Sequence, residues 1–282
     1  MKNPARIFFV CLWLAALAGC LHAQPSAETV SDGVSPPEIP PAASGEAEPP
    51  QPVLDAPTAV IQGDVLAVFV SIAEGGIHEA VAELTDGAGK KVLSFTGFRF
   101  PSESFADRWT ALGGISSVQA PGNYSLAVNV TCEDGRLVTL RADVEILRRD
   151  FVYEDIPLNQ AMSSLRADSD PRKTAEAREL WALLTAVNLP SVYHAGKLAL
   201  PVAEGFRETS FFGDRRTFLY TDGGKANSIH YGLDYATPRG TPVHSSGTGK
   251  VVMAKERILT GFSIVIEHLP GVYSLYYHLD KL

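Results

Sequence analysis

The strongest constraint on the fold is a period-two alternation of apolar and polar residues over positions 124–146. Every second position is apolar, at Tyr124, Leu126, Val128, Val130 and Cys132 and then at Val138, Leu140, Ala142, Val144 and Ile146. Because successive side chains of a β-strand point to opposite faces, each run predicts a strand with one buried face. Asp134-Gly135 between the runs predicts a hairpin turn. Cys132 lies in phase with the buried face, so we interpret it as a small core residue rather than a reactive thiol.

Further strands are predicted over residues 64–72 and 78–85, followed by turn residues at 86–89. Several short strands separated by regular turns are typical of a β-sandwich. We therefore expect an immunoglobulin-like β-sandwich over residues 58–148. Nothing in it resembles a catalytic site, so we interpret it as a spacer or binding module.

The N-terminal segment has the features of a targeting signal. Two basic residues precede an apolar run over residues 7–18, which has the length of a signal-peptide core. The run ends in Leu17-Ala-Gly-Cys20, which resembles a bacterial lipobox, in which the cysteine receives a lipid. We predict a signal peptide over residues 1–19 and lipidation of Cys20. Ordinary cleavage after Ala23 is the alternative.

Residues 20–57 are rich in proline and acidic side chains, and from Gln24 onward they contain no Lys or Arg. Few apolar side chains are available to offset the entropy of ordering, so we expect a disordered, extended tether between a membrane anchor and the folded parts. The whole chain of 282 residues carries a net charge of -8. This charge argues against a nucleic-acid partner, because phosphate binding needs a basic surface.

A connector is predicted over residues 149–200, with one helix at about 171–188. Asp170-Pro171 is a favourable helix start, since Asp caps free amides and Pro suits the first turn. Apolar residues then follow helical spacing at Ala177, Leu180, Trp181, Leu184 and Val187. We expect this stripe to pack against one of the β-rich domains.

The C-terminal domain, predicted over residues 201–282, is expected to be an antiparallel β fold. Its β-prone runs cover residues 241–244, 249–255, 263–268 and 272–279. Pro270-Gly271 predicts a tight turn between the last two runs.

The stretch Ser228-Ile-His-Tyr-Gly-Leu-Asp-Tyr235 carries the most informative side chains. If it forms a β-strand, His230, Gly232 and Asp234 share one face, and the glycine leaves room for an ion. A neutral imidazole and a carboxylate are a common ligand pair for Zn²⁺. Alone the pattern is weak, because a surface histidine four residues from an aspartate usually binds nothing.

The flanking motifs change this interpretation. Thr209-Ser-Phe-Phe-Gly-Asp-Arg-Arg216 lies upstream, and the downstream motifs are Gly240-Thr-Pro-Val243, Gly249-Lys-Val-Val252, Val265-Ile-Glu-His268 and Tyr276-Tyr-His-Leu279. In this order and spacing they resemble the M23 family of zinc metallopeptidases, the LytM/lysostaphin-type peptidoglycan endopeptidases. The resemblance covers roughly residues 206–282.

The resemblance implies an antiparallel β metallopeptidase domain that uses Zn²⁺ to hydrolyse peptide cross-links of peptidoglycan. It implies that His230 and Asp234 bind the metal and that His278 is catalytic, deprotonating water or stabilising the oxyanion. Tyr276 and His268 are assigned to the substrate groove, with a structural role for His268 as the alternative. Together with the N-terminal signal, this implies a cell-envelope lipoprotein that contacts stem peptides, cross-links and a membrane.

One family ligand has no counterpart in these motifs. In the family the third zinc ligand is the second histidine of a later His-x-His motif, and the sequence reaches Leu282 before such a motif. Catalytic zinc usually has three protein ligands and one position for water. We therefore expect a C-terminally truncated peptidase domain, with a degenerate family member as the alternative. The alternative function is a non-catalytic protein that binds the cell wall or regulates other wall hydrolases.

Overall fold

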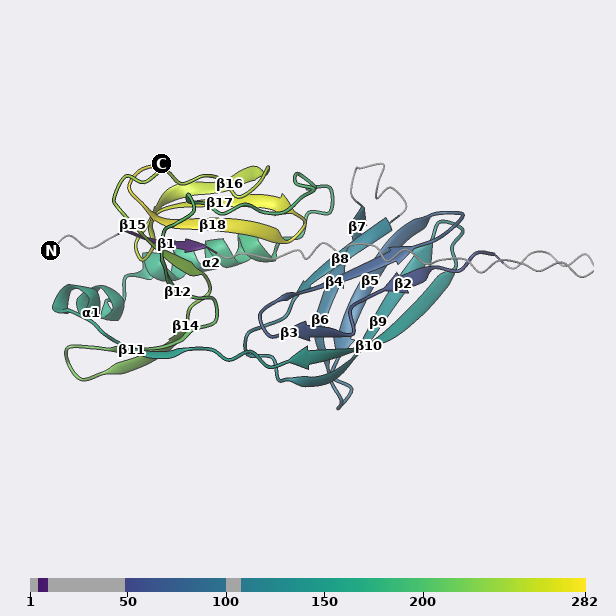
Figure 1. The fold of residues 1–282 in the computed structure, drawn as a ribbon, viewed down its shortest axis with the longest axis horizontal. Coiled ribbons are helices and arrows are strands. Elements are labelled where there is room, and N and C mark those ends of the chain that lie inside the picture. The colour runs from purple at the N-terminus through teal and green to yellow at the C-terminus, as the bar shows by residue number, and fades with distance from the viewer. Residues whose placement is uncertain (1–4, 10–48, 100–107) are drawn as a thin grey trace, which may run out of the picture.

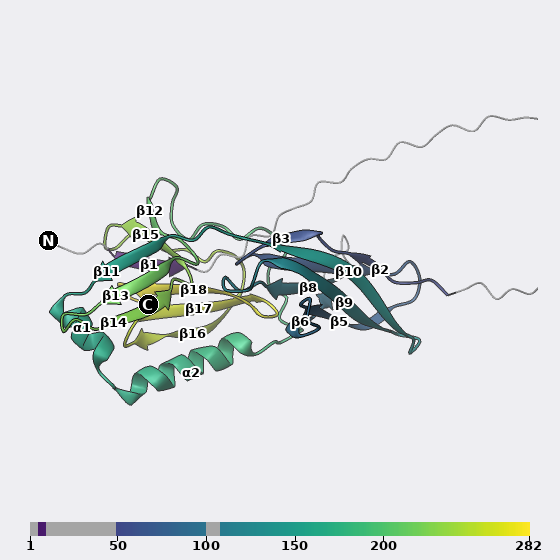
Figure 2. The same cartoon turned by 90° about the horizontal axis from the view of Figure 1, so that it is seen from below.

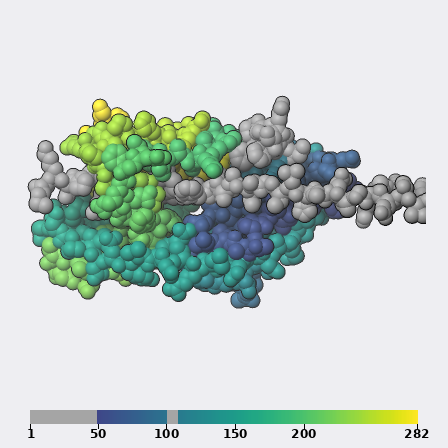
Figure 3. All heavy atoms as spheres, in the orientation of Figure 1, coloured from purple at the N-terminus to yellow at the C-terminus, as the bar shows by residue number. Residues whose placement is uncertain are grey.

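The computed structural model describes residues 5–9, 49–99 and 108–282, with only the backbone for residues 5–9. These residues form two β-rich parts that lie end to end along the long axis of the molecule (Figures 1 and 3). The prediction of a mainly β protein is confirmed. The predicted lipobox with Cys20, and the tether as far as residue 48, lie outside the described residues.

In the described residues, the N-terminal part is a sandwich of two sheets. The five-stranded sheet has the order β3-β10-β9-β5-β6, and the four-stranded sheet has the order β2-β4-β8-β7. The strands are β2 (Val53–Asp55), β3 (Ala59–Ile61), β4 (Val65–Ser71), β5 (Ile77–Thr85), β6 (Lys91–Thr96), β7 (Phe98–Arg99), β8 (Arg108–Gly114), β9 (Gly122–Cys132) and β10 (Leu137–Leu147). The immunoglobulin-like topology of this sandwich stays a prediction.

The predicted hairpin is confirmed as the antiparallel pair β9–β10. Gly135 in its turn has a φ of 85°, a backbone conformation that favours glycine. Both sheets contribute to one core, which includes Leu66, Val68, Leu84, Leu126, Val128, Val130, Val144 and Ile146. Cys132 belongs to this core and is 2% exposed, so its interpretation as a core residue is confirmed.

Two helices follow the sandwich. α1 (Gln160–Ala167) was not predicted, although Asn159 caps its first turn. α2 (Pro171–Thr185) begins at the predicted residue, with Asp170 as its cap, and ends three residues early. Among the described residues, no helix is both long enough and apolar enough to cross a membrane.

Helix α2 packs against the C-terminal part (Figure 2). Its Leu180, Leu183 and Leu184 contact a cluster formed by Met253, Val265 and Leu275. Trp181, which was predicted to belong to the buried stripe, is 71% exposed. The helix therefore buries fewer of its apolar residues than the helical spacing in the sequence predicted.

In the described residues, the C-terminal part contains three three-stranded sheets, with the orders β11-β13-β14, β16-β17-β18 and β1-β15-β12. The strands are β1 (Ala5–Phe9), β11 (Tyr153–Pro157), β12 (Glu208–Ser210), β13 (Arg215–Leu219), β14 (Lys225–Ile229), β15 (Leu233–Thr237), β16 (Lys250–Arg257), β17 (Gly261–Leu269) and β18 (Val272–Leu279). The strand predicted over residues 241–244 is absent.

The start of the predicted connector belongs to this β structure. β11 pairs with β13 in parallel, whereas the prediction was a purely antiparallel fold beginning near residue 201. That prediction is wrong for β11, because its pairing partner lies about sixty residues further along the chain and no local pattern identifies it.

His268 lies in the core of the β16-β17-β18 sheet region and has 0% exposure. Its Nδ1 donates to the carbonyl of Thr248 over 2.7 Å, and its Nε2 accepts from the hydroxyl of Ser274 over 2.8 Å. Both ring nitrogens are thus satisfied in the neutral imidazole. This burial and these two hydrogen bonds favour the structural role of His268 over its assignment to a substrate groove, which stays a prediction.

Protonation of His268 is expected to destabilise the fold. Burial lowers the pKa of this imidazole below its ordinary value, so the unfolded chain binds the proton more tightly than the folded chain. The free energy of unfolding should therefore be highest above about pH 6.5 and should decrease as the pH falls below that value. Urea unfolding of wild type, His268→Asn and the exposed control His244→Asn would measure it. An unchanged pH dependence in His268→Asn would contradict the prediction.

Candidate metal site

His230 and Asp234 are brought together by a bend rather than by a continuous strand. β14 ends at Ile229 and β15 begins at Leu233, so residues 230–232 lie between the two strands. The prediction of one strand through this stretch is wrong. The side chains nevertheless meet, because Nε2 of His230 lies 3.2 Å from Oδ1 of Asp234. Both residues are buried, with exposures of 3% and 0%.

The orientation of His230 is set by a backbone carbonyl. Its Nδ1 lies 3.0 Å from the carbonyl oxygen of Phe211, which can only accept a hydrogen bond, so the proton belongs on Nδ1. Nε2 then faces the carboxylate of Asp234: it donates a hydrogen bond there if the ring is an imidazolium, and it presents a lone pair if the ring is neutral. Two electron-rich atoms at 3.2 Å repel each other unless a proton or a metal cation lies between them.

The geometry of this pair fits a metal ion. Two ligand atoms bound to a tetrahedral zinc ion at about 2.0–2.2 Å lie about 3.3–3.6 Å from each other. The observed 3.2 Å between Nε2 and Oδ1 is close to this range. A histidine that donates its other nitrogen to a carbonyl is also the usual arrangement in metal sites, because it fixes the tautomer.

The second oxygen of Asp234 contacts a buried arginine. Nη2 of Arg216 donates to Oδ2 over 3.1 Å, and Arg216 is 6% exposed. Burial alone would raise the pKa of the Asp234 carboxyl, but its contacts with His230 and Arg216 together hold that pKa below its ordinary value. Arg216 also lies 3.5 Å from a carboxylate oxygen of Glu154 on β11. Asp234 is therefore an ionised carboxylate with one oxygen directed at His230.

Residues 211–215, which we call the Phe211–Arg215 loop, surround His230. The amide of Gly213 donates to the carbonyl of His230 over 2.7 Å, and the amide of His230 donates to the carbonyl of Asp214 over 2.9 Å. Gly213 has a φ of 89°, and a Cβ there would lie 2.1 Å from the ring of Phe151. The role of Phe211 could not be predicted from the sequence. It acts through its backbone carbonyl, which every residue has.

The described residues contain no group of three or more His, Cys, Asp or Glu side chains arranged to hold one metal ion. The site they form is the pair His230 and Asp234. Over the described ranges, His278, His268 and His244 do not complete this pair as a group of three possible metal ligands.

His278 lies in a β-bulge near the end of β18. Phe262 pairs with Leu279 and Ile264 pairs with Tyr276, so one extra residue is accommodated in β18. His278 has a φ of 56°, and its amide donates to the carbonyl of Thr260 over 2.8 Å. The predicted alternation of faces is therefore wrong beyond Tyr276.

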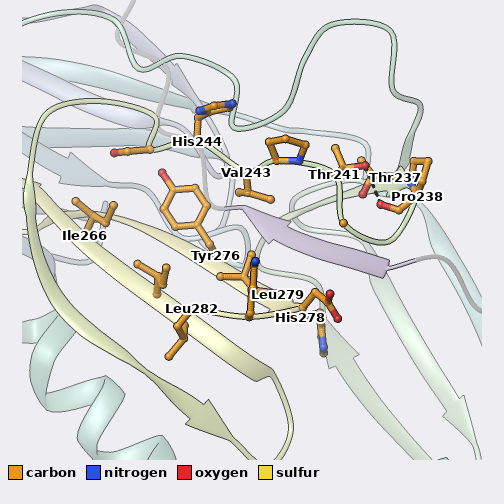
Figure 4. A pocket seen from close by; sticks show the side chains of 16 residues that line it. Thr237, Pro238, Thr241, Val243, His244, Ile266, Tyr276, His278, Leu279 and Leu282 are labelled. Carbon is orange, nitrogen blue, oxygen red and sulfur yellow. Dashed lines mark hydrogen bonds between the residues drawn. The ribbon is translucent and has the colours of Figure 1, made fainter.

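The bulge separates His278 from the face it was expected to share with Tyr276. Tyr276 and Leu279, which were expected on opposite faces, contact the same apolar cluster. In Figure 4 the imidazole of His278 points away from the phenol of Tyr276, although both residues line one pocket. The Tyr276 hydroxyl accepts the amide of Ser246 over 2.7 Å, and the residue is 2% exposed.

Comparisons with known proteins find one family that this region resembles. Residues 228–282 match the family model described as "Peptidase family M23". Peptidoglycan DD-endopeptidase ShyB of Vibrio cholerae is 40% identical over 83 residues, which are 29% of this chain and 19% of ShyB. Peptidoglycan DD-endopeptidase ShyA of the same organism is 39% identical over 82 residues, 29% of this chain and 18% of ShyA.

A protein of Buchnera aphidicola named "Uncharacterized metalloprotease" is 38% identical over 85 residues, 30% of this chain and 22% of that protein. The matched stretch thus spans about a fifth of the length of each of these relatives. The resemblance to family M23 found in the sequence is confirmed for this stretch, in which residues 228–282 match the family model.

Proposed function

We propose that this protein is a cell-envelope zinc metalloendopeptidase that hydrolyses peptide cross-links of peptidoglycan. One observation carries the proposal: Nε2 of His230 and Oδ1 of Asp234 face each other at 3.2 Å, with the imidazole tautomer fixed by Phe211. The names of the Vibrio cholerae relatives supply the substrate class.

In this proposal His230 and Asp234 hold Zn²⁺. When bound, the metal supplies Lewis acidity, which polarises a carbonyl and lowers the pKa of a coordinated water to about 7. Asp234 supplies the negative charge of the pair, and its contact with Arg216 fixes the plane of the carboxylate. His278 is assigned to proton transfer or oxyanion stabilisation. Tyr276 lines the same pocket as His278.

The alternative is a non-catalytic protein that binds the cell wall or regulates other wall hydrolases. It is favoured by the two-ligand site of the described residues and by the guanidinium of Arg216, which already balances the charge of Asp234. A metal assay and a muropeptide-release assay on the same sample distinguish the two, because the alternative requires neither tight zinc nor hydrolysis.

The proposed location is the bacterial cell envelope, periplasmic or outward-facing. The basis is the sequence Leu17-Ala-Gly-Cys20 behind an apolar run, together with a proline-rich segment of tether composition. A lipid on Cys20 would hold the protein at a membrane. The partners would then be that membrane and the stem peptides and cross-links of peptidoglycan.

Zinc binding should depend on both members of the pair. His230→Ala and Asp234→Ala are each expected to weaken zinc affinity at least tenfold, because each removes a metal-binding atom. Calorimetric titration with Zn²⁺ and metal content by mass spectrometry measure the effect. His244→Ala, which changes an exposed histidine, is the matched control. Equal zinc affinity in the wild type and in all three variants would contradict the assignment.

His278 should affect the rate and not the metal content. His278→Ala is expected to keep the wild-type zinc affinity and to slow release of muropeptides from cross-linked peptidoglycan by about 10²- to 10⁴-fold, the usual contribution of a general acid or base. Loss of zinc together with the rate would contradict its catalytic assignment. Absence of muropeptide release by the wild type would support the non-catalytic alternative.

Cys20 should determine membrane association. Cys20→Ala removes the thiol that a thioether-linked lipid requires, so the protein is expected to move from the membrane fraction to the soluble fraction. Cell fractionation followed by immunoblotting measures this, and Cys132→Ala controls for loss of a thiol. Unchanged partitioning of Cys20→Ala would count against the lipid anchor.

A further inference from the structure

We propose that the N-terminal β-sandwich positions His230 through the Phe211–Arg215 loop, so that the metal-binding geometry is set by contact between the two parts of the molecule. The inference rests on the proposed function, in which His230 is a zinc ligand. His230, Phe212 and Arg215 belong to the C-terminal part, whereas the two residues that hold the loop, Gly63 and Ser117, belong to the sandwich.

Arg215 links the loop to the sandwich. Its Nη2 donates to the carbonyl of Ser117 over 2.6 Å, and its Nη1 lies 3.3 Å from the Ser117 hydroxyl. The same Nη1 donates to the carbonyl of Gly213 in the loop over 2.7 Å. The guanidinium lies over the ring of Phe151, 4.2 Å from its centroid. Ser117 is 2% exposed, so this contact is well excluded from water.

Phe212 makes the second link. Its ring packs against Gly63 so closely that a Cβ at Gly63 would lie 2.6 Å from the ring. The amide of Gly63 donates to the carbonyl of Ile115 over 3.0 Å, which fixes this glycine to the sandwich. The Phe212 ring also lies near the ring of Tyr231, with 6.3 Å between centroids, and Tyr231 directly follows His230.

The loop in turn holds His230 at three points. The carbonyl of Phe211 accepts from Nδ1, the amide of Gly213 donates to the His230 carbonyl, and the carbonyl of Asp214 accepts from the His230 amide. A displacement of the loop therefore moves the backbone and the ring of His230 together. Loss of the Phe211 contact would free the imidazole to place its proton on Nε2, the nitrogen that faces Asp234.

A separate contact keeps the two parts docked. Phe98 of the sandwich packs with Leu269 and Val272 at the β17–β18 turn. It lies outside the Phe211–Arg215 loop, so perturbing the loop contact leaves this apolar contact in place. The effect on His230 can thus be separated from undocking of the sandwich.

The test compares two glycines of the sandwich in the full-length chain. Gly63 and Gly135 have the same φ of 85°, so Gly63→Ala and Gly135→Ala introduce similar backbone strain. A Cβ at Gly135 meets nothing within 4 Å, whereas a Cβ at Gly63 meets the ring of Phe212. Only Gly63→Ala should therefore act on His230.

Two readouts are needed. In the metal-free protein, long-range ¹⁵N NMR of labelled histidines reports which ring nitrogen of His230 carries the proton, with His230→Gln used for assignment. Wild type and Gly135→Ala should show a fully occupied proton on Nδ1, and Gly63→Ala should show a partly lost Nδ1 proton, because its hydrogen bond to the Phe211 carbonyl is weakened. Titration with Zn²⁺ alone should then give about a tenfold weaker affinity for Gly63→Ala than for Gly135→Ala.

Identical tautomers and affinities in the two glycine variants would overturn the proposal. If Gly63→Ala does not fold, as judged by thermal melting, Arg215→Gln tests the same link from the C-terminal side, with the exposed Arg239→Gln as its control. A wild type that binds no zinc but shows the predicted tautomer change would refute the metal function while supporting the positioning role.

Discussion

The hydrogen bond between Nδ1 of His230 and the carbonyl of Phe211 determines what the candidate site can bind. It directs Nε2 at a buried carboxylate 3.2 Å away. An arrangement of two buried acceptors is unfavourable unless a cation or a proton lies between them. The loop, its contacts with the sandwich and the bend at residues 230–232 all act by maintaining this one orientation.

Charge balance around Asp234 decides how readily a divalent cation can enter. Asp234 and Arg216 neutralise each other, and Glu154 on β11 contributes a further negative charge beside Arg216. A buried ion pair left without one partner is strongly destabilising, commonly by about 3–5 kcal/mol. Arg216 therefore keeps the metal-free site stable, while Glu154 offsets part of the repulsion that Arg216 exerts on an entering cation.

Much of the fold could be predicted because the information is local. The hairpin β9–β10 follows from residue alternation, and β18 begins and ends where the pattern of residues 272–279 does. α2 begins where Asp170 and Pro171 indicate. β11 could not be predicted, because a parallel pairing with β13 depends on chain segments far apart in sequence. The cap Asn159 was a usable signal for α1, but the helix is short.

The candidate site was predicted at the level of residue types and not of geometry. His230 and Asp234 were identified from their spacing, yet a bend and not a strand joins them. The bulge that turns His278 away from Tyr276 leaves no sequence signature, since His278 is a non-glycine residue with a positive φ. The burial of His268 could not be predicted from sequence, because it depends on neighbours that the fold supplies. These neighbours are Thr248 and Ser274.

The central claim is that His230 and Asp234 together bind a metal ion. X-ray absorption at the zinc edge of the zinc-loaded protein tests it most directly, because imidazole ligands give a recognisable scattering pattern. The account predicts nitrogen and oxygen ligands at about 2.0–2.2 Å with an imidazole contribution that disappears in His230→Gln. A spectrum with sulfur ligands, or an imidazole contribution that is unchanged in His230→Gln, would contradict it.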